Sequence, residues 1–244
     1  MRYLALAFVA ALVMPGVILA APAVSPAITA ALADPARADQ QGDDAHRKPA
    51  ELLAFAGVKP GQQIVDVLPG GGYWTRIFTG VVGASGHVYA LWPNAAAGYG
   101  AKAVPALQAR NLANVTVAVD PAIITVAKPV DLVWTVQNYH DLANKGGGEA
   151  ALGAFNAAVF KALKPGGIYV VVDHAAATGS GIADTETLHR IDPAIVKREI
   201  TNAGFVFVGE SKALANPADD HTLKVFDPAI RGKTEQFVYK FRRP

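Results

Sequence analysis

The chain of 244 residues has no cysteine and only a small charge imbalance, with 22 lysines and arginines against 20 aspartates and glutamates. The absence of cysteine excludes disulfides, thiolate nucleophiles and thiolate metal sites. A formal net charge of +2 lacks the basic excess of a nucleic-acid-binding surface, so no nucleic-acid partner is expected. Because 52% of the residues are hydrophobic, a disordered chain is also excluded, and the chain is long enough to bury a core without disulfides.

Long apolar runs are also absent, except at the N-terminus. Residues 3–21 are almost wholly apolar, Arg2 precedes them, and Ala21-Pro22-Ala23 has the small residues of a cleavage site. This is the layout of a secretory signal peptide, so we predict cleavage after residue 23. The remaining chain would be periplasmic or secreted and would not contact the membrane. An uncleaved membrane anchor is the alternative, since the run is about long enough to span a bilayer.

Short apolar segments alternate with helical patterns after residue 48, which is typical of a mostly parallel α/β sheet. The predicted strands cover residues 62–68, 87–91, 115–119, 130–136, 168–174, 205–211 and 236–241. The predicted helices cover residues 49–58, 73–83, 99–112, 148–163 and 193–204. We therefore predict one Rossmann-like, doubly wound domain over residues 49–244. Residues 24–48, rich in Ala, Pro, Asp and Arg, are predicted to form a linker whose second part is helical.

Three consecutive glycines follow the first predicted strand, in the sequence VDVLPGGGYWT (65–75). Glycine allows a left-handed backbone and the close approach of a ligand. The helix that follows would present its N-terminal N–H groups to an anionic group. The stretch is not a complete dinucleotide-binding GxGxxG motif, because Thr75 stands where the third glycine would be.

Polar clusters occur where several predicted strands end. Gln137-Asn138-Tyr139-His140-Asp141 follows the fourth strand, Asp173-His174 ends the fifth, and Asp219-Asp220-His221 lies between the last two. Ligands of open α/β sheets bind at the carboxyl ends of the strands, so we expect the first two clusters there. Histidine beside a carboxylate suits proton transfer near neutral pH. A divalent cation is an alternative, but no fixed ligand spacing is present and no metal ligand is assigned.

The connection between the last two predicted strands is long. It covers the 25 residues from 211 to 235, which is typical of a lid or a substrate wall. As an alternative to metal binding, Asp219 and Asp220 would cap this loop or brace it against Arg190 or Arg231.

The order of elements and motifs resembles the class I S-adenosylmethionine-dependent methyltransferases over residues 49–244. Asp66, Gly70 and Gly72 match the first motif of that family, whose last strand runs antiparallel. The last segment of the chain more closely resembles a bacterial subgroup of predicted methyltransferases, many of which carry signal peptides. The segments that carry this likeness are QNYHD (137–141), DTETLHRID (184–192), NPADDHT (216–222) and FDPAIRGKTEQFVYKF (226–241).

The resemblance implies S-adenosylmethionine as cofactor and methyl transfer to an unidentified small molecule. The residues implied in cofactor binding are Asp66, Gly70, Gly71, Gly72, Trp92 and Asp120. Trp92 stands where such folds usually have a ribose-binding acid, and Asp120 follows the third strand, where the family often contacts adenine. Turn formation before Pro121 is the alternative for Asp120, and a place in the core is the alternative for Trp92.

The residues after the fourth strand lie beside the transferring methyl in related enzymes. The resemblance therefore implies Asn138, Tyr139 and His140 as catalytic residues, with His140 as the leading candidate base and His174 nearby. Leu68 and Trp92 depart from the family pattern, because a glycine and an acid are usual there. Two other functions remain open: a non-catalytic periplasmic ligand-binding module with this fold, and a nicotinamide-dependent enzyme.

Overall fold

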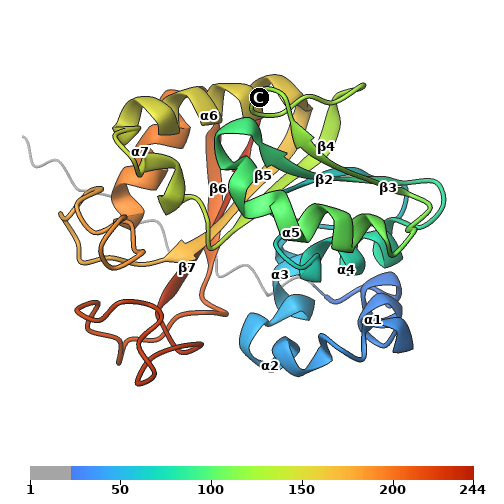
Figure 1. The fold of residues 1–244 in the computed structure, drawn as a ribbon, viewed down its shortest axis with the longest axis horizontal. Helices are drawn as coiled ribbons and strands as arrows, with labels where there is room; N and C mark the ends of the chain where they lie inside the picture. Colours follow the sequence, from blue (N-terminus) through green and yellow to red (C-terminus); the bar gives the residue numbers. More distant parts are fainter. Residues whose placement is uncertain (1–22) are drawn as a thin grey trace, which may run out of the picture.

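Seven strands form one sheet in the order β3-β2-β1-β4-β5-β7-β6 (Figure 1). The structure is a computed structural model and describes residues 23–244; all but the last residue of the predicted signal peptide lies outside the described residues. Only β7 runs antiparallel, to both of its neighbours. The predicted fold class is therefore confirmed. The strands are β1 (Gln63–Val67), β2 (His87–Pro93), β3 (Val115–Asp120), β4 (Val130–Val136), β5 (Leu163–His174), β6 (Val206–Ser211) and β7 (Gln236–Arg242).

The five predicted helices are observed, and two more precede them. The helices are α1 (Pro26–Leu32), α2 (Asp44–Arg47), α3 (Pro49–Ala56), α4 (Tyr73–Val82), α5 (Ala97–Gln108), α6 (Gly148–Ala162) and α7 (Pro193–Asn202). Short 3-10 turns lie at Pro35–Arg37, Gln41–Asp43, Asn94–Ala96 and His140–Ala143. Proline begins α1, α3 and α7, where its missing N–H costs no hydrogen bond. Among residues 23–244, no helix combines the length and apolarity needed to cross a bilayer.

The central strands are buried on both faces, so their side chains alternate between two apolar layers. Val65 and Val67 point to the layer that holds α6 and α7, and Ile64 points to the layer that holds α1, α3 and α4. This explains the nearly continuous apolar sequence of β1 and β4, since both faces of a parallel sheet exclude water. Because β4 pairs in parallel with both β1 and β5, the carboxyl ends of these three strands meet at one edge of the sheet.

The prediction of a linker at residues 24–48 is corrected by the structure, because this segment is folded onto the domain. Ile28 of α1 is 1% exposed and packs in the layer that includes α4. Arg37 is buried and its Nη2 lies 2.7 Å from Asp44 Oδ1. Arg76 of α4 donates two hydrogen bonds to the Asp39 carboxylate, at 2.8 and 3.0 Å. The sequence indicated a linker because the helices of this segment are short. In addition, Arg76, the ionic partner of Asp39, is distant in sequence.

Replacement of Ile28 by alanine should lower the free energy of unfolding by about 2–5 kcal/mol, since it removes buried methyl groups and leaves a cavity. Urea unfolding measures the effect. Thr29→Ala on the exposed side of the same helix is the control and should change stability by less than about 0.5 kcal/mol. Equal effects of the two substitutions would mean that the segment is not part of the folded core.

Candidate functional site

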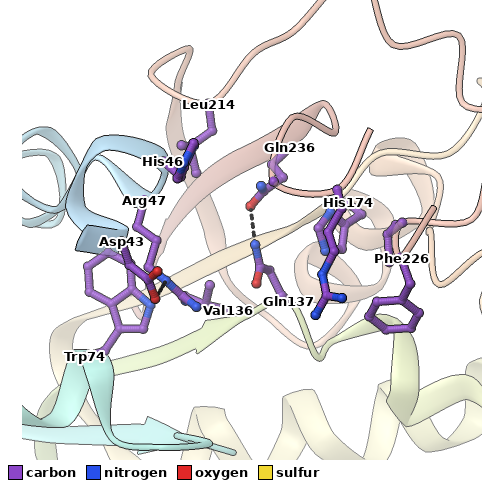
Figure 2. A pocket seen from close by; sticks show the side chains of 13 residues that line it. Asp43, His46, Arg47, Trp74, Val136, Gln137, His174, Leu214, Phe226 and Gln236 are labelled. Carbon is purple, nitrogen blue, oxygen red and sulfur yellow. Dashed lines mark hydrogen bonds and ion pairs between the residues drawn. The ribbon is translucent and has the colours of Figure 1, made fainter. Parts of the chain in front are cut away.

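Three cavities lie at the edge where the parallel strands end. The first, the glycine-loop cavity, has about 220 Å³ and is lined by Asp66, Leu68, Gly70, Gly71, Gln137, Asn138, Arg47 and their neighbours. The second, the histidine cavity, has about 390 Å³ and is lined by His174, Gln137, Gln236, Phe226, Arg231 and the α2 end (Figure 2). The third, the apolar cavity, has about 370 Å³ and is lined by Leu68, Tyr99, Ile123, Leu142, Phe155 and others.

The glycines after β1 have the backbone geometry that the sequence predicted. Gly70 and Gly72 adopt left-handed φ angles of 55° and 78°. A Cβ on Gly72 would lie only 2.6 Å from the Leu107 Cδ1 atom of α5, so no other residue fits there without displacement. Gly72 also caps the N-terminus of α4, whose first N–H groups therefore point toward the loop.

Asp66 lies beneath this loop and is 2% exposed. Its carboxylate accepts a 2.6 Å hydrogen bond from the Thr75 hydroxyl in the first turn of α4. Burial raises the pKa of Asp66 to about 7, and the hydrogen bond from Thr75 opposes that rise. Asp66 therefore ties the end of β1 to α4 while lining the glycine-loop cavity.

Leu68 lines both the glycine-loop cavity and the apolar cavity. Its φ angle is 52°, a left-handed conformation that a leucine rarely adopts. The Leu68 N–H donates to the Leu91 carbonyl of β2 at 2.8 Å, which helps to hold the strained backbone. The turn thus keeps the shape that a glycine would give, but a side chain stands between the two cavities.

Asn138 and Gln137 bring the end of β4 into the site. Asn138 Nδ2 donates to the Val67 carbonyl at 3.1 Å, and its Oδ1 accepts from the Thr135 hydroxyl. Gln137 has a left-handed φ of 58° and lines both the glycine-loop and the histidine cavities. Its Nε2 donates to Gln236 Oε1 at 3.1 Å, as Figure 2 shows. Both residues line the glycine-loop cavity; Asn138 is one of the predicted site residues, and Gln137 is not.

The carboxylate closest to the His140 ring is not that of its neighbour in sequence, Asp141, but that of Asp173. The Nδ1 atom lies 2.8 Å from Asp173 Oδ1, and the backbone N–H donates to Asp173 Oδ2 at 2.8 Å. Burial opposes protonation of His140, but the charge and hydrogen bond of Asp173 outweigh it and raise the pKa of the imidazole. His140 is 3% exposed and lines none of the three cavities. The prediction that His140 is a base in contact with the substrate is therefore corrected by the structure.

His174 is the predicted catalytic histidine that faces a cavity. It lines the histidine cavity, and its Nδ1 atom lies 2.7 Å from the Thr234 hydroxyl. Burial lowers the pKa of His174 to about 4, although the Asp173 charge opposes this. The imidazole is consequently neutral near pH 7 and has a lone pair on one of its two ring nitrogens.

Three other predicted site residues lie away from the three cavities, so their predicted roles in the site are corrected by the structure. Tyr139 is wholly buried; its hydroxyl accepts a hydrogen bond from Asn156 Nδ2 at 2.8 Å. Trp92 is 1% exposed and packs in the core with Leu107. The Asp120 carboxylate accepts hydrogen bonds from the N–H of Ala122 and from Thr125, so it shapes its own turn. All three residues were predicted at the ends of strands, but the sequence does not determine which way each side chain points.

The segment at 24–48 supplies site residues that were not expected from the sequence. Asp43, His46 and Arg47 line the histidine cavity, and Arg47 also lines the glycine-loop cavity. Figure 2 shows them on the side opposite His174. Gln40 Nε2 donates to the Gly71 carbonyl at 3.2 Å, so the same segment contacts the glycine loop. No motif marks these residues, because only the tertiary contacts bring them to the strand ends.

The connection between β6 and β7 forms a wall of the histidine cavity, as predicted; Leu214, Val225, Phe226 and Arg231 belong to it. Arg190 donates two hydrogen bonds to Asp219, at 2.9 and 3.0 Å, and both side chains are almost fully buried. Arg190 also donates to the carbonyls of Ala175 and Leu223. The predicted bracing is confirmed for Arg190 and Asp219, and it fixes the wall against the end of β5. Asp220 instead accepts hydrogen bonds from the backbone N–H and hydroxyl of Thr222 in its own turn.

Comparisons with known proteins place this geometry in a known fold. No family model matches the sequence, and no curated protein matches it. Solved structures do match. A SAM-dependent methyltransferase from Aquifex aeolicus is 16% identical, with a TM-score of 0.53 over 87% of this chain and 95% of that one. The N-methyltransferase NodS from Bradyrhizobium japonicum is 13% identical, with a TM-score of 0.56 over 84% and 99% of the two chains.

The chain has the class I methyltransferase fold. A third match is the [4+2]-cyclase SpnF, 15% identical, with a TM-score of 0.58 over 84% of this chain and 82% of that one. One fold can therefore carry different reactions, and the likeness at these identities concerns the fold alone.

His174 should make stability depend on pH. Its pKa of about 4 is below the value of 6.5 in an unfolded chain, so the unfolded state binds more protons between these values. The free energy of unfolding should rise by about 3 kcal/mol from this group as the pH increases from 4 to 6.5. Urea unfolding of wild type and His174→Asn between pH 4.5 and 7 measures the difference. Parallel pH dependences of the two proteins would contradict the neutral, buried state of His174.

Proposed function

We propose that the protein transfers a methyl group from S-adenosylmethionine to a small-molecule acceptor. The observation that carries this proposal is the connection between two cavities at the strand ends. The glycine-loop cavity and the histidine cavity share Arg47, Trp74, Val136 and Gln137 in their walls. In the class I methyltransferase fold, this arrangement would bring a donor on the glycine loop next to an acceptor beside His174. Transfer needs such alignment in a site that excludes water.

The cofactor would occupy the glycine-loop and apolar cavities. Its amino-acid end would lie against the bare backbone of Gly70 and Gly71, near the N-terminus of α4. The Arg47 guanidinium would bind the carboxylate, because paired N–H donors match that group. The apolar cavity beyond Leu68 has room for the adenosine part, with Ile123 and Phe155 in its walls.

The acceptor would occupy the histidine cavity. Neutral His174 would accept the proton that an oxygen or nitrogen nucleophile loses around the time of attack. Gln137 and Gln236 would orient the acceptor, and Phe226 and Arg231 would cover it from the β6–β7 connection. His140 does not touch this cavity, so its role would be indirect.

A second candidate function is a ligand-binding module without catalysis. Leu68 favours it, because its side chain stands between the two cavities that the cofactor would occupy together. A nicotinamide-dependent enzyme has less support, since Thr75, where GxGxxG requires glycine, is a buried residue bonded to Asp66.

Calorimetric titration with S-adenosylmethionine, and separately with S-adenosylhomocysteine, tests the proposal. We expect saturable binding of one molecule per chain at micromolar concentration. Arg47→Met should weaken binding by about 10- to 100-fold, the loss expected for one hydrogen bond to a charged group. Arg198→Met is the matched control, because Arg198 is half exposed and pairs with Glu149 and Glu199 away from the cavities. Absent binding at millimolar concentration, in wild type and Leu68→Gly alike, would favour the non-catalytic module.

The predicted export is part of the same proposal. The protein would act in the periplasm or outside the cell after its signal peptide has been cleaved. Mass spectrometry of the protein recovered from the periplasm or medium of a bacterial host should give the mass of residues 24–244, starting at Val24. Recovery only of the 244-residue chain in the membrane fraction would support the uncleaved anchor instead.

A further inference from the structure

Two histidines and an aspartate meet next to the histidine cavity, but outside its wall. Among residues 23–244, His140, Asp141 and His189 are the only His, Cys, Asp or Glu side chains that form a group of three with ligand atoms all within 4.8 Å of one another. His140 Nε2 lies 3.3 Å from His189 Nδ1 and 3.4 Å from Asp141 Oδ1. His189 Nδ1 lies 3.7 Å from Asp141 Oδ1.

These three distances form the face of a tetrahedron of the size that a zinc ion requires. Zinc lies about 2.0–2.2 Å from nitrogen and oxygen ligands, so the ligand atoms of a tetrahedral site are about 3.3–3.6 Å apart. The loop after β4 supplies two of the atoms, and the connection from β5 to α7 supplies the third. His189 reaches this position with a left-handed φ of 56°, an unusual conformation for histidine.

The hydrogen bond behind His140 leaves the lone pair of its neutral imidazole on the nitrogen that faces the cluster. Asp173 is fully buried and accepts from the backbone N–H groups of His140 and His174. It therefore has to receive an N–H from His140 Nδ1, which leaves His140 Nε2 as an electron-pair donor. A carboxylate behind a ligating histidine is the arrangement that fixes the imidazole in metal sites.

The charges agree with the geometry. With neutral imidazoles, Asp141 and Asp173 give the group two negative charges. If the His189 proton is on Nε2, three lone-pair atoms lie 3.3–3.7 Å from one another. Such a group needs a positive charge at its centre. We propose that His140, Asp141 and His189 bind a divalent transition-metal ion of the zinc class, with Asp173 as the positioning residue behind His140.

Three protein ligands leave the fourth position of a tetrahedral ion open for water or a substrate atom, as in catalytic rather than structural zinc sites. Two residues of the histidine cavity lie close to the cluster. The His174 ring centroid lies 6.3 Å from that of His140, and the Phe226 ring centroid lies 4.9 Å from that of His189. Both line the histidine cavity. The ion would also join the β4 loop to the β5–α7 connection. The metal site does not depend on methyl transfer.

Zinc titration of the untagged chain, first stripped with a chelator, tests the proposal by calorimetry. We expect one Zn²⁺ per chain and a rise in the melting temperature on binding. Co²⁺ in its place should give the visible absorption of a tetrahedral site. His189→Ala should lower Zn²⁺ affinity by at least 100-fold and abolish the thermal shift. Since His189 is only partly buried, this variant should still fold.

The matched control is His221→Ala. His221 is also a loop histidine paired with an acid, Glu235 at 2.8 Å, and it lies outside the cluster. It should keep wild-type Zn²⁺ affinity. Asp173→Asn should weaken binding by about 10- to 100-fold if the protein keeps its circular dichroism spectrum. Zn²⁺ binding that is absent from wild type, or equally strong in His189→Ala, would overturn the site and would mean that a proton holds the three groups together.

Discussion

The buried carboxylate of Asp173 is the interaction on which the strand-end region depends. It lies at the end of β5 with no exposure to water, where an unpaired charge would be very unfavourable. Backbone N–H groups of His140 and His174 and the His140 ring satisfy it. These bonds lower the pKa of Asp173 although burial alone would raise it. One carboxylate thereby fixes one histidine in a cluster and the other in the wall of a cavity.

A second buried charge pair gives that cavity its shape. The β6–β7 connection is long and would be mobile without anchors. Arg190 and Asp219 bond each other and several backbone groups, so their desolvation is compensated by a nearly complete set of hydrogen bonds. On the other side, the N-terminal helices bring Arg47 to the same edge through the ion pair of Arg76 and Asp39. Figure 1 shows both segments at the same end of the sheet.

The class I methyltransferase fold and the local chemistry answer different parts of the question of function. The sheet order places the ends of β1 and β4 side by side, which is the switch point where such folds bind ligands. What binds there depends on side chains, and here Leu68 and Trp92 differ from the usual pattern. Leu68 maintains a left-handed turn without glycine, and Trp92 is part of the core. In the proposed function, the donor pocket would therefore be built from Arg47 and an apolar wall rather than from a ribose-binding acid.

The sequence by itself determined the sheet, the five helices after residue 48 and the glycine loop, because periodicity and glycine positions are local properties of the chain. It also indicated Asn138 and His174, since residues after parallel strands must lie at one edge. Only the tertiary structure decided that Tyr139 points into the core and that residues 24–48 form a wall of the site. It likewise brought His189 to His140, 49 positions away. The physical reason is that side-chain direction and long-range ion pairs depend on packing between elements, which no local pattern records.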